Sequence, residues 1–183
     1  CQWLTTILIV RLSGFEDRGV YGLAMTFTAA FGILALFNTR QYQVSDVVGE
    51  YSDQTYIRSR YIAMAAAFLI CAAGVFLNDY TPYQWSVILL YMMHKCAEAW
   101  IDVYHGVDQK NGRMDYICYS YLTRGILMLV SFCAVLYLTK NLVAAVASMT
   151  FITCFTAVFY DKRIAERFIS KESETDRAAV KKL

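Results

Sequence analysis

The stretch Gly19–Thr39, GVYGLAMTFTAAFGILALFNT, contains 21 residues without a charged side chain. Two further stretches have the same character, since Tyr61–Asn78 has 18 uncharged residues and Asn141–Tyr160 has 20. A helix of about 20 apolar residues crosses the hydrocarbon core of a bilayer. In a chain of 183 residues, 58% of them hydrophobic, these runs predict an all-α, polytopic membrane helical bundle rather than a soluble domain.

The spacing of apolar and polar segments predicts about six transmembrane helices. Their expected ranges are 1–10, 19–37, 61–77, 82–104, 116–138 and 142–160, and the first is read as the remainder of a truncated helix. Residues 11–18 are expected to form a polar loop. Within the longer loop 38–60, the spacing of Tyr42, Val47 and Tyr51 predicts a short amphipathic helix at the membrane surface. The charged tail from Asp161 is expected to be helical through Phe168.

Lysine and arginine residues are distributed unevenly between the two ends of this bundle. The loop 38–60, the loop 105–115 and the tail together hold twelve of them, whereas the loops on the opposite side hold three. Positively charged residues prefer the cytoplasmic side of a membrane. The tail and the loop 38–60 are therefore predicted to be cytoplasmic.

Charged residues also occur within the predicted spans, in MMHKCAEAWIDVYHGVDQKNGRMD (Met92–Asp115) and on the following helix. A charge at membrane depth is costly and needs a structural or functional reason. At about 1.5 Å per residue, Lys95 and Glu98 lie roughly 14 and 9 Å from the helix end predicted at Tyr104, and Asp102 about 3 Å. Arg124 lies about 12 Å deep on the next, antiparallel helix by the same rise.

These four side chains have three possible roles. The favoured one is an internal ion-pair cluster, in which Lys95 pairs with Glu98, and Arg124 with Glu98 or Asp102. In the second, the side chains face a water-filled cavity, where arginine and lysine suit the oxygens of a phosphate group. In the third, the long side chains extend to the interface. Lys95, Glu98 and Asp102 are expected on one stripe of their helix.

The remaining polar groups give weaker signals. The six cysteines form no CxxC pair, so they are expected to be small buried residues rather than metal ligands or disulfides. His94 and His105 are the two histidines. Packing or a position near the cavity is favoured for His94, a position at the cytoplasmic rim for His105, and a proton relay is the less favoured role for both. No catalytic residue, cofactor, metal or nucleic-acid partner is predicted.

Three segments resemble polysaccharide and oligosaccharide flippases. They are RLSGFEDRGVYGLAMTFTA, FNTRQYQVSDVVGEYSDQTYIRSRYI and YHGVDQKNGRMDYICYSYLTRGIL, starting at residues 11, 37 and 104. They are similar to the first helix junction, to the loop before the third helix and to the fifth helix of the Wzx-like branch of the multidrug/oligosaccharidyl-lipid/polysaccharide exporter superfamily. The likeness extends to about residue 168 and is a diffuse pattern rather than a catalytic signature.

This resemblance implies a transporter of two six-helix lobes around a central cavity. It implies that undecaprenyl-pyrophosphate-linked sugar units are carried by alternating access across the bacterial cytoplasmic membrane. The chain would be the amino-terminal lobe (residues 1–168) and the cytoplasmic inter-lobe linker (residues 169–183), with a carboxy-terminal lobe missing. Arg124, and Lys95 second, best fit the family's pyrophosphate-binding cavity residues. A polysaccharide polymerase and glycosyltransferases would be partners.

Two other functions compete with this interpretation. A multidrug exporter of the same fold would place ion-coupling carboxylates in the first helix, which is mostly missing here. A membrane-bound lipid-phosphate enzyme would use aspartates such as Asp102, Asp108 and Asp115 with a metal. These aspartates lack the DxxDGxxAR pattern of CDP-alcohol transferases, so a transporter is favoured and an enzyme is not expected.

Overall fold

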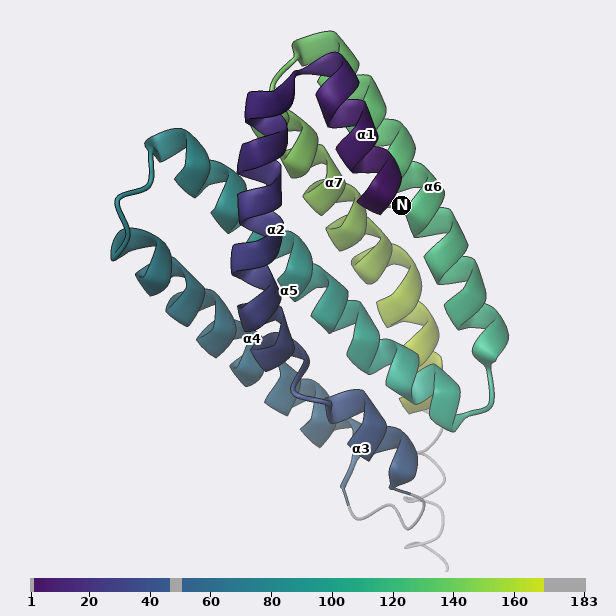
Figure 1. Ribbon diagram of the computed structural model, residues 1–183. Coiled ribbons are helices and arrows are strands. Elements are labelled where there is room, and N and C mark those ends of the chain that lie inside the picture. Colours follow the sequence, from purple (N-terminus) through teal and green to yellow (C-terminus); the bar gives the residue numbers. More distant parts are fainter. Residues whose placement is uncertain (1, 47–50, 170–183) are drawn as a thin grey trace, which may run out of the picture.

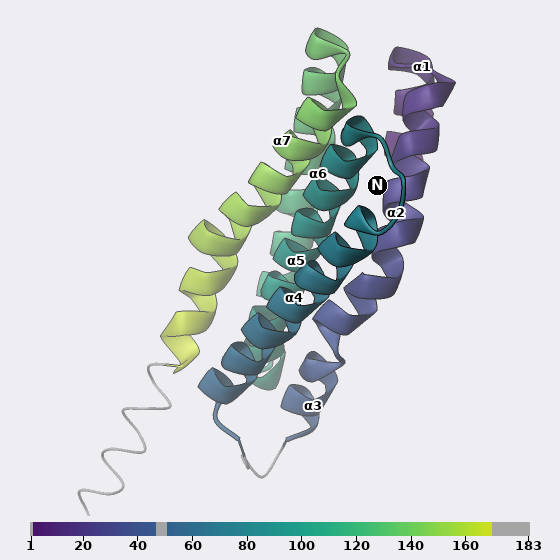
Figure 2. The same ribbon diagram turned by 90° about the vertical axis from the view of Figure 1, so that its left-hand side faces the viewer.

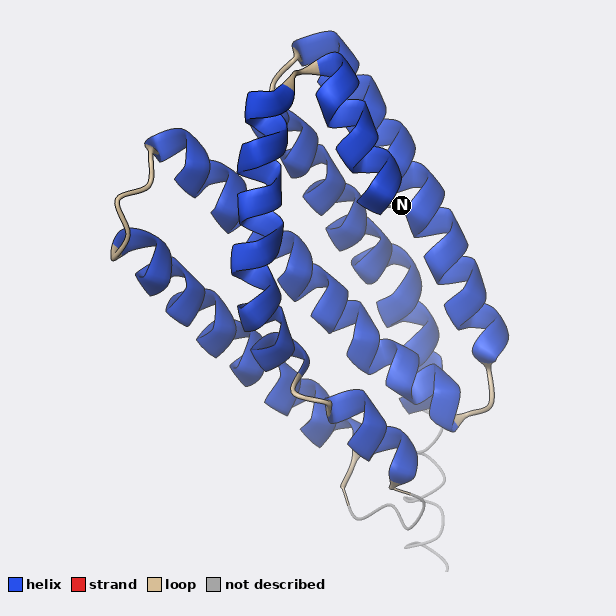
Figure 3. Ribbon diagram, in the orientation of Figure 1, coloured by secondary structure: helices blue, strands red, loops and turns tan. Residues whose placement is uncertain are grey.

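The computed structural model describes residues 2–46 and 51–169. Within these ranges the chain consists of helices joined by short loops and contains no strand (Figure 3). The helices are α1 (Gln2–Leu12), α2 (Phe15–Leu36), α3 (Thr39–Ser45), α4 (Asp53–Phe76), α5 (Pro82–Lys110), α6 (Met114–Thr139) and α7 (Leu142–Thr156). A π-helical turn, η1 (Ala157–Asp161), follows α7, and helical structure continues to residue 169. The predicted all-α membrane bundle is confirmed.

Helix α5 is the axis of the bundle. It packs against α2, α3, α4, α6, α7 and η1. Figures 1 and 2 show that α1 and α2 lie on one side of α5. Helices α6 and α7 lie on another side, and α4 lies on a third. The core is apolar along most of its length, and in its middle the rings of Tyr21 and Tyr91 meet edge to face with centroids 5.5 Å apart. Side chains of α5 therefore face other helices in nearly every direction.

Four helical segments of the described chain are long and apolar enough to cross a membrane. They are Phe15–Ser45, Asp53–Phe76, Met114–Thr139 and Leu142–Ile169. Helix α5 has 29 residues, a length that exceeds the roughly 20 needed for a span, but its polar residues lower its hydropathy. Helix α1 has 11 residues, about half a span.

The connections alternate between two ends of the bundle, as six antiparallel spans require. Helix α3, the α5–α6 turn and the end of the described chain lie at one end, which is the lower end in Figure 1. The α1–α2, α4–α5 and α6–α7 connections lie at the other end. This arrangement places α3, the α5–α6 turn and the described part of the tail at the same end, as the sequence predicts.

Two helix starts show how local sequence sets the boundaries. At α5, Thr81 and Gln84 form a capping box: the Thr81 N–H donates to Gln84 Oε1 (2.9 Å), the Gln84 N–H donates to Thr81 Oγ1 (3.4 Å), and Pro82 occupies the first turn. At α7, the Asn141 side chain accepts hydrogen bonds from two backbone N–H groups of the first turn. Such caps satisfy donors that have no partner inside the helix.

The structure corrects two of the predicted loops. Residues 11–18 do not form a polar loop, because only Ser13 and Gly14 separate α1 from α2, and Gly14 has a φ of 105° that suits glycine. The loop 38–60 is shorter than predicted, since α4 begins at Asp53, eight residues before the apolar run. A short helix, α3, is present in this segment, but it ends at Ser45 and does not include Tyr51, so the predicted helix is confirmed only in part. Val47 and the predicted linker, apart from Ile169, lie outside the described residues.

Candidate functional site

An open cavity of about 430 Å³ lies between five helices on the α1–α6 side of α5. Its lining residues come from α1 (Thr5), α2 (Tyr21), α5 (Tyr91, His94, Glu98), α6 (Tyr121, Arg124, Gly125, Met128) and α7 (Met149). The walls are therefore mainly aromatic and sulfur-containing, with one arginine, one glutamate and one histidine. Cavities of this kind, apolar with a few placed polar groups, are the usual form of a ligand site.

Arg124 is the cation of this cavity. The residue is 8% exposed, and its guanidinium carbon lies 5.2 Å from the centre of the Tyr121 ring. Its Nη1 has no hydrogen-bond partner within the described parts of the chain. A buried guanidinium N–H group without a partner is energetically costly. Arg124 can therefore offer hydrogen-bond donors to an anionic group that enters the cavity.

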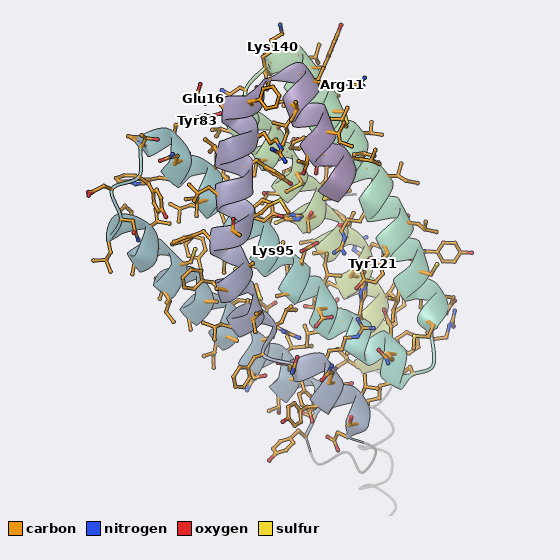
Figure 4. All side chains as sticks on the ribbon, viewed as in Figure 1. Arg11, Glu16, Tyr83, Lys95, Tyr121 and Lys140 are labelled. Carbon is orange, nitrogen blue, oxygen red and sulfur yellow. The ribbon has the colours of Figure 1, made fainter. Side chains whose placement is uncertain are left out.

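Glu98 is the anion of the same cavity, and a lysine and a histidine lie beside it on α5. Lys95 Nζ lies 2.9 Å from Glu98 Oε2, and His94 Nε2 lies 3.7 Å from Glu98 Oε1. On its other side, His94 Nδ1 lies 3.1 Å from Thr153 Oγ1 of α7. Figure 4 shows Lys95 and Tyr121 near the middle height of the bundle. The predicted Lys95–Glu98 pair is present in the structure.

Asp102 belongs to a different cluster. Its carboxylate lies 2.8 Å from Arg60 Nη2 of α4 and 3.3 Å from Arg40 Nη1 of α3. Arg60 has no exposed surface and also donates to the carbonyls of Ala35 (3.0 Å) and Leu36 at the end of α2. Arg124 and Asp102 are therefore not paired, because Arg60 and Arg40 occupy the carboxylate from the opposite side of α5.

The Asp102 cluster borders an open, polar cavity of about 630 Å³ between α3 and α5. Arg40 and Gln109 both line this cavity and connect α3 to α5, since Arg40 Nε and Nη2 donate to Gln109 Oε1 at 3.1 and 2.7 Å. Sequence reasoning missed Arg60 because it counted this residue with the loop. Arg60 directly precedes the apolar run Tyr61–Asn78, and this position was the signal that could have placed it on the same helix. In the structure that helix, α4, begins at Asp53 and includes Arg60.

A third polar cluster was also missed. His105 Nε2 of α5 lies 3.0 Å from Asp161 Oδ1 of η1, and Asp108 of α5 is buried beside them. Asp108 lies beyond Tyr104, where the predicted membrane-crossing part of α5 ends. Burial, together with the Asp161 carboxylate, raises the pKa of Asp108 to about 7. The sequence placed His105 and Asp108 in the loop 105–115 and Asp161 in the charged tail, whereas α5 continues as a helix to Lys110.

The described chain offers no group of three or more metal-binding side chains. Five cysteines in the described ranges are free thiols, and only Cys71 is fully buried. Fold and site together define a helical membrane bundle with a charged cavity among its helices.

Comparison with known proteins gives one weak relation. The chain is 26% identical over 162 residues to the capsular polysaccharide biosynthesis protein CapF of Staphylococcus aureus. The match covers 88% of this chain, and the chain spans 40% of the length of that relative. No protein-family model matches the chain, and no solved structure matches it. The relation weakly suggests a role in polysaccharide biosynthesis.

Proposed function

We propose that this chain is part of a membrane carrier that moves lipid-linked oligosaccharides across the bacterial cytoplasmic membrane during polysaccharide biosynthesis. The similarity to a capsular polysaccharide biosynthesis protein and the membrane-compatible helices support this proposal. The cargo would be of the undecaprenyl-pyrophosphate type, and the protein would be a carrier rather than an enzyme. The remaining part of the carrier would lie outside this chain, and polymerases and glycosyltransferases would act before and after it.

The observation that carries the proposal is the burial of Arg124 with an unpaired hydrogen-bond donor. Its guanidinium is buried at the wall of a 430 Å³ cavity and has a donor without a partner. A pyrophosphate supplies several oxygens that accept charge-assisted hydrogen bonds from guanidinium and ammonium groups. Lys95 stands next to the cavity through its pair with Glu98, so it would be the second contact.

The balance of charge in the cavity favours an anionic cargo. The Glu98 carboxylate lies against Lys95, so Arg124 adds a positive charge that no described carboxylate neutralises through an ion pair. Asp102 is excluded from this role because it is paired with Arg60 and Arg40. The excess cation is thus in the wall of the cavity, where an anionic headgroup could reach it.

Surface polysaccharide in cells that express the full-length protein tests the proposal. Arg124→Ala should abolish surface polysaccharide while membrane levels stay normal, and Arg124→Lys, which keeps the charge but loses the bidentate fork, should restore part of it. Arg58→Ala is the matched control, since Arg58 is exposed on α4. Normal polysaccharide in Arg124→Ala cells would remove the assignment of Arg124 as the cargo contact.

A further inference from the structure

The cluster of His105, Asp108 and Asp161 lies at the α3 end of the bundle. None of the three residues lines the 430 Å³ cavity that contains Arg124. The three side chains are almost fully buried, with exposed fractions of 0%, 1% and 1%. Besides the 3.0 Å contact between His105 Nε2 and Asp161 Oδ1, each residue keeps one polar atom without a hydrogen-bond partner among the described residues. These atoms are His105 Nδ1, Asp108 Oδ1 and Asp161 Oδ2.

The π-helical turn η1 brings Asp161 into this cluster. The Lys162 N–H donates to the carbonyl of Ala157, five residues earlier, instead of four as in an α-helix. Such a turn contains one extra residue, which changes the direction of the side chains that follow it, and π-turns in helices occur frequently at functional sites. Here Ala157 and Asp161 both become buried against the neighbouring helices. The irregular turn therefore serves to bury a carboxyl group.

Charge makes this arrangement unfavourable unless protons are bound. Asp108 and Asp161 have no lysine or arginine in an ion pair with them in the described chain. Arg113, a cation whose charge acts on Asp108, forms its ion pair with the exposed Asp115. The carboxylates of Asp108 and Asp161, of which only Asp161 contacts the His105 imidazole among the described residues, would repel each other in a medium of low polarity.

The other groups around the cluster do not neutralise it. From α6, the Tyr121 ring meets the His105 ring with centroids 5.1 Å apart, and Asp115 adds a further negative charge that acts on Asp108. From η1, Tyr160 lies within the electrostatic range of Asp108 and Asp161. None of these groups supplies a positive charge. A proton from water is therefore the cation that this cluster can accept.

We propose that His105, Asp108 and Asp161 form a proton-binding site at the junction of α5, α6 and η1. Asp108 holds the exchangeable proton, and the Asp161 carboxyl group, which contacts His105, lies beside it. In this step an O–H bond of a hydronium ion from the solvent breaks, an O–H bond forms on the Asp108 carboxylate, and a water molecule is released. The described packing needs the protonated form, so release of the proton favours an arrangement in which this end of the bundle admits water.

Two facts support this site independently of cargo. The cluster contains buried polar atoms on two elements, α5 and η1, that have no hydrogen-bond partner among the described residues, and the pKa of Asp108 is raised for the reasons given above. The inference goes beyond the proposed function and does not depend on it, because proton binding is measurable without cargo. A failure of the polysaccharide assay would leave this site untouched, and the converse also holds.

Infrared difference spectroscopy of the full-length protein in lipid nanodiscs tests the site directly, since the C=O absorption of a protonated carboxyl group is separate from the carboxylate bands. At about pH 6, below the raised pKa of Asp108 and above that of an ordinary aspartate, the wild type should show this absorption. Asp108→Asn should lose it, and the control Asp115→Asn should keep it. Asp161→Asn removes the repelling charge and should shift the titration midpoint of Asp108 to lower pH by about one unit or more.

Two results would overturn the proposal. The first is an acid absorption that is equally strong in the wild type and in Asp108→Asn over about pH 5 to 9, a range that spans the ordinary and raised carboxyl values. The second is failure of Asp108→Asn to fold, as judged by size-exclusion chromatography. Asparagine mimics the neutral carboxyl group, so a site that holds Asp108 protonated must tolerate it.

Discussion

Replacing Asp102 with alanine leaves the Arg60 guanidinium buried without its carboxylate. Arg60 has no exposed surface, and Asp102 Oδ2 lies 2.8 Å from its Nη2. The side chain of Asp102 is 21% exposed, so water has access to one edge of this pair. The Arg60 charge would then keep only the carbonyl groups of Ala35 and Leu36 as acceptors.

The magnitude follows from these contacts. Breaking a buried ion pair by removing one partner destabilises a protein by about 3–5 kcal/mol. The two carbonyl acceptors and the partial exposure of Asp102 moderate this loss, so we expect about 3 kcal/mol for Asp102→Ala. The double variant Arg60→Met/Asp102→Leu removes both charges and refills the space, and such replacements are often neutral or stabilising. It should therefore recover most of the lost stability.

Reversible unfolding in mixed detergent micelles, with denaturing detergent as the variable, measures these differences. Glu166→Ala is the matched control, because it breaks an exposed pair with Lys162 (3.8 Å) and should cost about 0–1 kcal/mol. A double variant as unstable as the sum of its single changes would refute the reasoning, because it would show that Arg60 and Asp102 contribute independently. A loss below about 0.5 kcal/mol for Asp102→Ala would refute it as well.

Three further predictions use the same unfolding assay. Thr81→Ala removes the side-chain half of the capping box with Gln84 and should cost about 1 kcal/mol, whereas Thr81→Ser should cost much less. Gly106→Ala places a methyl group against the buried side chain of Gln43 and should cost about 1–3 kcal/mol; an unchanged unfolding midpoint would show that Gln43 can move aside. The folded-state pKa of Asp108 is raised from 3.8 to about 7, so its stabilising contribution is full below pH 4 and falls as the pH rises toward 7. Asp108→Asn should flatten this dependence of the unfolding midpoint, and a wild-type midpoint that does not vary with pH would contradict the raised pKa.

The overall architecture was readable from the sequence because it depends on coarse properties. Three uncharged runs of about 20 residues required helices of membrane length. The alternation of the connections between the two ends followed from consecutive antiparallel spans. The ends of the helices were less predictable, since α4 begins in the polar segment at Asp53. Hydropathy indicates where a helix can contact lipid, and it does not register turns that extend beyond the membrane or pack under a loop.

The candidate site was predictable only in part. Lys95, Glu98 and Arg124 were expected at similar depth, and the structure places Lys95 against Glu98, with Glu98 and Arg124 lining one cavity. Depth along a helix comes from a constant rise per residue, so a sequence can supply it. Asp102 was expected on the same stripe, yet it faces Arg60 across another interface of α5. The direction in which a side chain points depends on how neighbouring helices are placed around it, and that information is not local.

These differences have a common cause in the central position of α5. The four described segments that are long and apolar enough to cross a membrane surround α5, which is more polar. A helix enclosed by other helices can carry polar residues, because these residues contact the neighbouring protein rather than lipid. Along α5, Glu98 meets Lys95, Asp102 meets Arg60, and His105 meets Asp161. The Lys95–Glu98 pair lies within α5, whereas Asp102 faces Arg60 of α4 and His105 faces Asp161 of η1. Relative movement of α4 or η1 would therefore change one ionic contact without breaking the others. A carrier that opens one end of its bundle while keeping the other closed needs contacts that can separate in this independent way.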